Sequence, residues 1–112
     1  WQWPLAVLLA LGLIFFIASR APTLSSAAVS DARALQIVTA HCAGCHAAQP
    51  VNPAFNAPPA GVVLDNLDTL SHYREQVLAQ AVNSQAMPLG NASGMTLTER
   101  GELGQWLKTQ KP

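Results

Sequence analysis

The chain has 112 residues, with six basic and six acidic side chains and a net charge of zero at neutral pH. This length allows one small domain and little more. The neutral balance argues against nucleic acid as a partner, because binding nucleic acid requires a positive surface, and against long-range electrostatic steering.

Residues 1–19 contain no charged side chain and consist mainly of Leu, Ile, Val, Phe and Ala. As a helix this segment would be about 28 Å long, close to the hydrocarbon thickness of a bilayer. Trp1 and Trp3 at one end and Arg20 at the other are typical interfacial anchors. The alternatives are a buried core helix and a signal peptide, which has a basic start and a shorter apolar stretch. We predict a transmembrane helix at residues 1–19, in contact with membrane lipid.

Residues 20–30 are rich in Pro, Ser and Ala without an amphipathic period, which predicts a linker. Residues 31–112 show no run of alternating β-branched residues, so we expect an all-α domain. The first helix should begin at Ser30–Asp31, which are good capping residues, and run to His46. Four prolines between residues 47 and 65 then exclude a continuous helix.

A second helix is expected to start after Asp65–Asn66 and to continue to about Val82. A loop at residues 84–95 should follow it. Thr96 and Glu99 form a capping box that opens the last helix. The inner face of that helix should carry Leu103, Trp106 and Leu107. We expect Trp106 to be a packing residue, and Gly101 and Gly104 to let the first helix approach near Ala34.

Cys42-Ala43-Gly44-Cys45-His46 is a CxxCH motif. On a helical turn, positions i, i+3 and i+4 share one face, so two thiols can reach one edge of a porphyrin while the imidazole reaches the iron. This motif is typical of c-type haem attachment, with His46 as an axial ligand. Two alternatives compete with haem. A disulfide or thioredoxin-like redox site is typical of a βαβ context, and a zinc site would need further ligands from His41, His46 or His72.

Two methionines, Met87 and Met95, are available as the second axial ligand. We favour Met87, because Pro88 stiffens the loop that presents it and restrains Met87 to extended geometry. Met95 precedes a helix cap and is better explained as a hydrophobic staple. The predicted metal ligands are therefore His46 and Met87. The second ring nitrogen of His46 should bond a backbone carbonyl, with the Pro58-Pro59 region as its source. His41 and His72 are expected to face solvent.

The combination of CxxCH on an N-terminal helix, a Met-Pro loop and a Trp on the terminal helix resembles class I cytochromes c over residues 31–110. One departure is Ala34, where that class commonly has Gly at the helix crossing. A narrower resemblance is carried by residues 80–107 (QAVNSQAMPLGNASGMTLTERGELGQWL), HCAGCH and residues 57–65 (APPAGVVLD). These segments resemble the C-terminal cytochrome domain of the bacterial membrane-bound urate oxidase (urate hydroxylase) family.

That resemblance implies a haem c domain on the periplasmic side of the bacterial inner membrane, accepting electrons from a membrane-embedded urate-oxidising unit. A soluble cytochrome or a terminal oxidase would be the acceptor. The chain alone would be an electron-transfer module with no catalytic residues. Two alternatives stay open: a cytochrome subunit of another respiratory complex, such as a quinol dehydrogenase or terminal oxidase, and a haem sensor with a labile sixth ligand. Whether the chain is a fragment of a polytopic protein or a separate subunit also stays open.

Overall fold

The computed structural model describes residues 1, 3–19 and 27–111. Over these residues the predicted all-α fold class is confirmed, with six α-helices and no strand. The helices are α1 (Trp3–Ser19), α2 (Asp31–His41), α3 (Ala43–His46), α4 (Leu67–His72), α5 (Arg74–Val77) and α6 (Leu97–Thr109). Two short 3-10 helices, η1 (Pro59–Gly61) and η3 (Leu89–Asn91), and a π-helix, η2 (Leu78–Asn83), complete the described chain. Most of the predicted linker, including Arg20, lies outside the described residues.

The apolar segment at the start of the chain forms α1, a single helix of 17 residues. Among the described residues, none of the helices has both the length and the apolar character to cross a membrane. The helix begins two residues later than the predicted segment, at Trp3, and ends with it at Ser19. The transmembrane helix at residues 1–19 stays a prediction.

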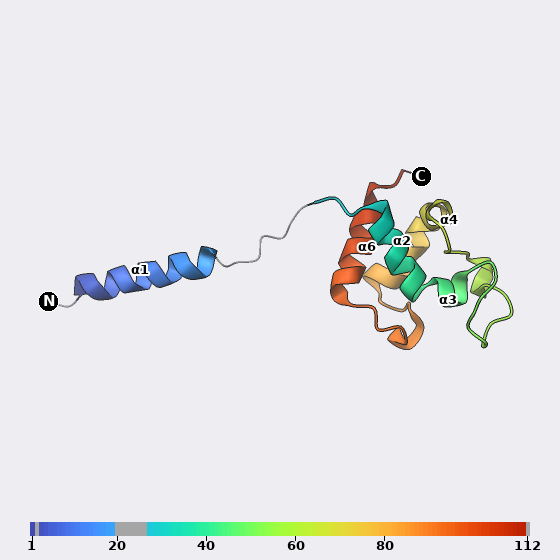
Figure 1. Cartoon of the computed structure of the whole chain (residues 1–112), viewed down its shortest axis with the longest axis horizontal. Helices are drawn as coiled ribbons and strands as arrows, with labels where there is room; N and C mark the ends of the chain where they lie inside the picture. The colour runs from blue at the N-terminus through green and yellow to red at the C-terminus, as the bar shows by residue number, and fades with distance from the viewer. Residues whose placement is uncertain (2, 20–26, 112) are drawn as a thin grey trace.

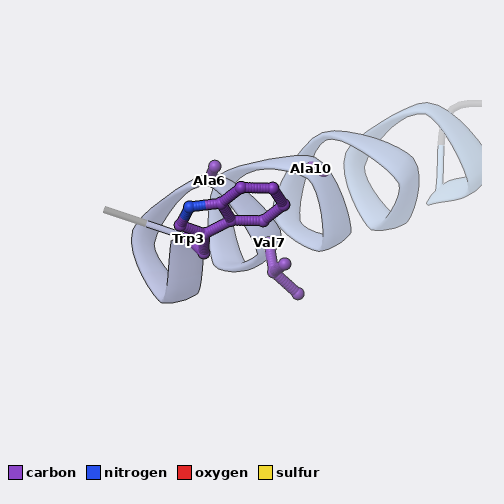
Figure 2. Close-up of a pocket in the computed structure, with 4 residues that line it drawn as sticks. All are labelled: Trp3, Ala6, Val7 and Ala10. Atoms are coloured by element: carbon purple, nitrogen blue, oxygen red, sulfur yellow. The ribbon is translucent and has the colours of Figure 1, made fainter. Parts of the chain in front are cut away.

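The side chains described on α1 are exposed. Trp3, Leu8 and Leu9 are 82%, 67% and 74% exposed, and the ring of Trp3 lies along the helix beside Ala6, Val7 and Ala10 (Figure 2). These residues form an open apolar surface of one helix and not an enclosed cavity. Nothing among the described residues covers this surface.

The core is built by α2, α4, α5, η2 and α6, with α2 and α6 lying side by side (Figure 1). Its fully buried side chains come mainly from α2 and α6, namely Ala34, Ile37, Val38, Leu103, Trp106 and Leu107, joined by Leu64, Leu70, Val77, Ala81 and Met95. Trp106 is 3% exposed and its Nε1 donates to Asp31 Oδ1 at 2.8 Å, which confirms that it packs on the first helix.

The helix starts follow the capping signals. The Ser30 side chain accepts from the amide of Arg33 to open α2, and Thr96 and Glu99 form the predicted capping box of α6. The predicted helical segments end where expected, at His46 and next to Val82, but neither is one continuous helix. The first helix breaks at Cys42, and the second breaks at Tyr73, whose ψ of 17° lies outside the helical region, before it continues into η2.

The expected role of the two α6 glycines is also corrected. A Cβ on Gly104 would lie 2.8 Å from Cγ1 of Val82, so Gly104 makes room for η2 and not for α2. A Cβ on Gly101 would meet nothing within 4 Å. The close approach therefore occurs at one glycine, between α6 and the π-helix.

Candidate functional site

The CxxCH residues lie at the junction of α2 and α3. The amides of Cys45 and His46 both donate to the carbonyl of Cys42, at 3.2 and 2.9 Å. This turn keeps positions 42, 45 and 46 in the i, i+3, i+4 relation that haem attachment requires. Cys42 and Cys45 are both free thiols and both are half-buried.

Two loop segments hold this turn in place. The amides of Val51 and Asn52 donate to the carbonyl of Gly44 at 3.1 and 3.0 Å, and the Asn52 side-chain amide donates to Cys45 Sγ at 3.4 Å. On the other side, the amide of Leu64 donates to the carbonyl of His46 at 2.6 Å. The proline-rich loop that excluded helix in the sequence therefore folds back and fixes the motif.

The His46 ring has a defined orientation. Its Nδ1 lies 2.9 Å from the carbonyl oxygen of Val62, directly after η1. A carbonyl oxygen can only accept, so Nδ1 carries the proton and, in the neutral ring, Nε2 keeps its lone pair. Nε2 makes no hydrogen bond within the described part of the chain. The predicted backbone carbonyl is thus found, three residues beyond Pro59.

Burial dominates the electrostatics of the first cysteine. Desolvation raises the pKa of the Cys42 thiol to about 11, while the nearby Arg100 guanidinium opposes the shift and the neighbouring Cys45 adds to it. A thiol with this pKa stays protonated near neutral pH and is a weak nucleophile. This is unlike a thioredoxin-type cysteine, whose pKa is lowered.

The two methionines occupy different environments. Met95 is 3% exposed within the core, and Asn91 holds its amide and its carbonyl at 3.0 and 3.2 Å. Met87 is half-buried and packs against the edge of the core. Its amide donates to the carbonyl of Gln80 at 2.8 Å. Met95 therefore has a packing role, whereas the Met87 side chain is only half covered by the chain.

The prediction for the other two histidines is half right. His72 is exposed, with its ring edge-on to Tyr73. The side chain of His41 is only 7% exposed, because Nδ1 lies 2.8 Å from Ser93 Oγ and Nε2 lies 3.2 Å from Glu99 Oε2. His41 thereby connects α2 to the residues before and within α6. Over the described ranges, no three His, Cys, Asp or Glu side chains gather as a metal site, so the zinc alternative finds no ligand set there.

Sequence reasoning missed one residue near the candidate site, Arg100. It is 5% exposed and donates to the carbonyls of Ala81 and Met87. A signal was present: Arg100, Leu103 and Leu107 are spaced i, i+3, i+7, so all three fall on the inner face of α6.

Whether these residues fit a haem can be judged from burial. Eight apolar side chains pack against the core and remain partly exposed: Val29, Cys42, Val62, Leu67, Tyr73, Leu78, Val82 and Met87. Cys42, Val62 and Met87 of this set belong to the candidate site. These apolar side chains, two free thiols and a His46 Nε2 with no hydrogen bond among the described residues have the chemistry that a covalently attached haem needs from its protein.

No protein-family model, curated protein or solved structure matches the chain.

Proposed function

We propose that this chain is a mono-haem c-type cytochrome that transfers electrons. The observation that carries the proposal is the CxxCH turn, in which His46 Nδ1 is engaged by the carbonyl of Val62 and Nε2 remains free. This is the arrangement expected of an axial histidine, because bonding of one ring nitrogen fixes the tautomer and the ring orientation for the other. Met87, which is half-buried on a loop that packs against the same core, is the proposed second axial ligand.

The chain's own residues have distinct roles in this proposal. Cys42 and Cys45 would hold the porphyrin through thioether bonds, and His46 and Met87 would ligate the iron. The haem, when bound, supplies an iron that cycles between the ferric and ferrous states. If His46 and Met87 both ligated the iron, no coordination site would remain for a substrate, and the chain would serve as an electron-transfer module. The class I cytochrome c fold is part of this proposal.

The apolar surface of α1 supports a membrane tether. Trp3, Leu8 and Leu9 are exposed among the described residues, and an apolar surface of this kind is favourably covered by lipid. The haem domain would then lie on the periplasmic side of a bacterial inner membrane, close to a membrane-embedded donor. The resemblance to the urate oxidase family makes a urate-oxidising unit the proposed donor, with a soluble cytochrome or terminal oxidase as acceptor.

Axial ligation is tested with a matched pair of variants, Met87→Ala and Met95→Leu. Ligation by Met87 predicts that Met87→Ala abolishes the far-red charge-transfer band of methionine-ligated ferric haem and lets the ferrous form bind carbon monoxide. Met95→Leu is nearly volume-conserving and should leave both properties unchanged. Carbon monoxide binding by the wild type at neutral pH would contradict the ligand set and favour a sensor with a labile sixth ligand.

The donor is tested in membranes that contain the chain with its native partners. Adding urate should reduce the haem within the turnover time of urate oxidation. Reduction by a quinol but not by urate would contradict the urate-oxidising donor and indicate another respiratory complex. Carbonate washing of the same membranes tests the tether, because a chain released into the wash would contradict attachment through α1.

A further inference from the structure

Arg100 of α6 is a buried cation, 5% exposed. Among the described residues, no carboxylate lies within ion-pair distance of its guanidinium. Its Nη1 donates to the carbonyls of Ala81 and Met87, the latter at 2.6 Å, and its Nη2 donates to Asn91 Oδ1 at 3.4 Å. Burying a cation is unfavourable unless its donors are satisfied. These acceptors explain how Arg100 can be buried, and each of them lies in or beside the segment that carries Met87.

One acceptor of Arg100, the carbonyl of Ala81, comes from an unusual helix end. The amide of Ser84 donates to the carbonyl of Ala79 at 3.1 Å, a spacing of five residues that defines the π-helix η2. The last carbonyls of a helix have no partner within it. Here the carbonyl of Gln80 accepts from the amide of Met87, and that of Ala81 accepts from Arg100. The π-helix thus presents carbonyls that anchor the following loop.

As a result the backbone of Met87 is held on both sides. Its amide is bound to Gln80 at 2.8 Å and its carbonyl to Arg100 at 2.6 Å. The Asn91 side chain, which also accepts from Arg100, is bound to Met95 in the core. A single guanidinium therefore connects η2, the Met87 turn and η3 to α6.

We propose that Arg100 is a positioning residue that holds the Met87 sulfur at the axial position. This inference rests on the proposed function, because it concerns the geometry of the proposed haem ligand. Arg100 acts through the backbone of Met87 and does not itself touch the iron. Its planar fork can donate to several acceptors at once, which a lysine ammonium on a flexible stem does less well.

The test compares Arg100→Met and Arg100→Lys with a control, Arg33→Met, in the full haem-loaded chain. Arg33 also bonds α6, through Glu102 Oε2 at 3.0 and 2.7 Å, but it is half-buried. Its side-chain hydrogen bonds within the described part of the chain go to Gln36 and Glu102 and not to the loop that carries Met87. Imidazole is titrated into the ferric protein, where it competes with Met87 for the iron. The far-red charge-transfer band and the melting temperature are recorded for each variant.

We expect the imidazole midpoint to fall about tenfold in Arg100→Met, since a hydrogen bond from a charged donor at its usual strength corresponds to about this factor in an equilibrium constant. Arg100→Lys should recover part of the loss, and Arg33→Met should keep the wild-type midpoint. If Arg100→Met does not fold, Arg100→Lys is compared with Arg33→Met. An imidazole midpoint that is lower in Arg100→Lys than in Arg33→Met then supports the inference.

The inference would be overturned if folded Arg100 variants kept the wild-type imidazole midpoint and charge-transfer band and only their melting temperature were lowered. Arg100 would then be a packing residue. Failure of the proposed function is recognised separately in the wild type. It would show as absence of covalently bound haem, or as a Met87→Ala variant with the wild-type charge-transfer band and imidazole midpoint; either result would overturn the inference as well.

Discussion

Replacing each α6 glycine with alanine tests the packing between α6 and η2. Gly101 and Gly104 lie three residues apart on the same helix, so both substitutions gain the same helix propensity. Alanine is more favourable than glycine inside a helix by about 0.5–1 kcal/mol. A Cβ at position 101 meets no atom within 4 Å, whereas a Cβ at position 104 would lie 2.8 Å from Val82 Cγ1.

The close contact decides the sign of the second substitution. Carbon atoms pack best at about 3.5–4.0 Å, so the Val82 side chain or the helix axis must move. Overpacking of this kind costs about 1–3 kcal/mol. Gly101→Ala should therefore raise the free energy of unfolding by about 0.5–1 kcal/mol. Gly104→Ala should lower it by roughly 1 kcal/mol after the propensity gain is subtracted.

Thermal unfolding of the haem-loaded chain measures the difference. About 1 kcal/mol corresponds to about 4–8 °C in a domain of this size, so the two variants should differ by at least several degrees in opposite directions. Combining Gly104→Ala with Val82→Ala should relieve the contact, making the pair less destabilised than the sum of the single variants. Equal stabilisation by the two glycine substitutions would refute the close approach of α6 and η2.

Two further predictions concern the ends of α6. Trp106→Phe removes the Nε1 bond to Asp31 and should lower the free energy of unfolding by about 1 kcal/mol. A double-mutant cycle in denaturant should show a smaller destabilisation by Trp106→Phe in an Asp31→Ala background. The Thr96 amide, followed by the His41 contact, lowers the pKa of the Glu99 carboxyl from its ordinary value of 4.5. The stability that this charge contributes is present above the unfolded pKa near 4.5 and is lost as pH falls through the lower folded pKa. Glu99→Gln retains the capping geometry without the charge. In acid unfolding, the wild type should be more stable than Glu99→Gln above this pH window, and the difference in free energy of unfolding should disappear as pH falls through it. A difference independent of pH would contradict the prediction.

The parts of the fold that depend on local chemistry could be predicted from the sequence. Ser30 and Thr96 start helices where expected, because capping is decided by a side chain and an amide a few residues apart. The inner face of α6 also follows from its period, since Leu103, Trp106 and Leu107 are all buried. The chain position of the CxxCH turn is equally local.

What could not be predicted depends on contacts across the fold. The break at Tyr73 has no proline or glycine near it, and the break at Cys42 precedes Gly44, which the structure places within α3. His41 is covered because Ser93 and Glu99, more than fifty residues away, pack beside it. The carbonyl that orients His46 belongs to Val62, because the proline-rich loop folds back onto the motif. From the sequence, the residue that supplies this carbonyl could be predicted only to within a few positions.

One of the two carbonyls that hold Arg100, that of Ala81, lies in a π-helix, which no periodic pattern in the sequence predicts. For that reason the inner-face spacing of Arg100 could be read from the sequence, while its partners could not. The same holds for Gly104, whose neighbour Val82 is set by the path of η2.

Covalent attachment of haem at Cys42 and Cys45 is the central claim, and a pyridine haemochrome spectrum of the denatured, solvent-extracted chain tests it most directly. The chain is expressed with the cellular machinery for haem attachment, and a Cys42→Ala, Cys45→Ala variant is the control. Covalent attachment predicts a c-type spectrum that survives extraction in the wild type and is lost in the variant. Removal of all haem from the wild type by the solvent would contradict it, and Cys42 and Cys45 would then need another role.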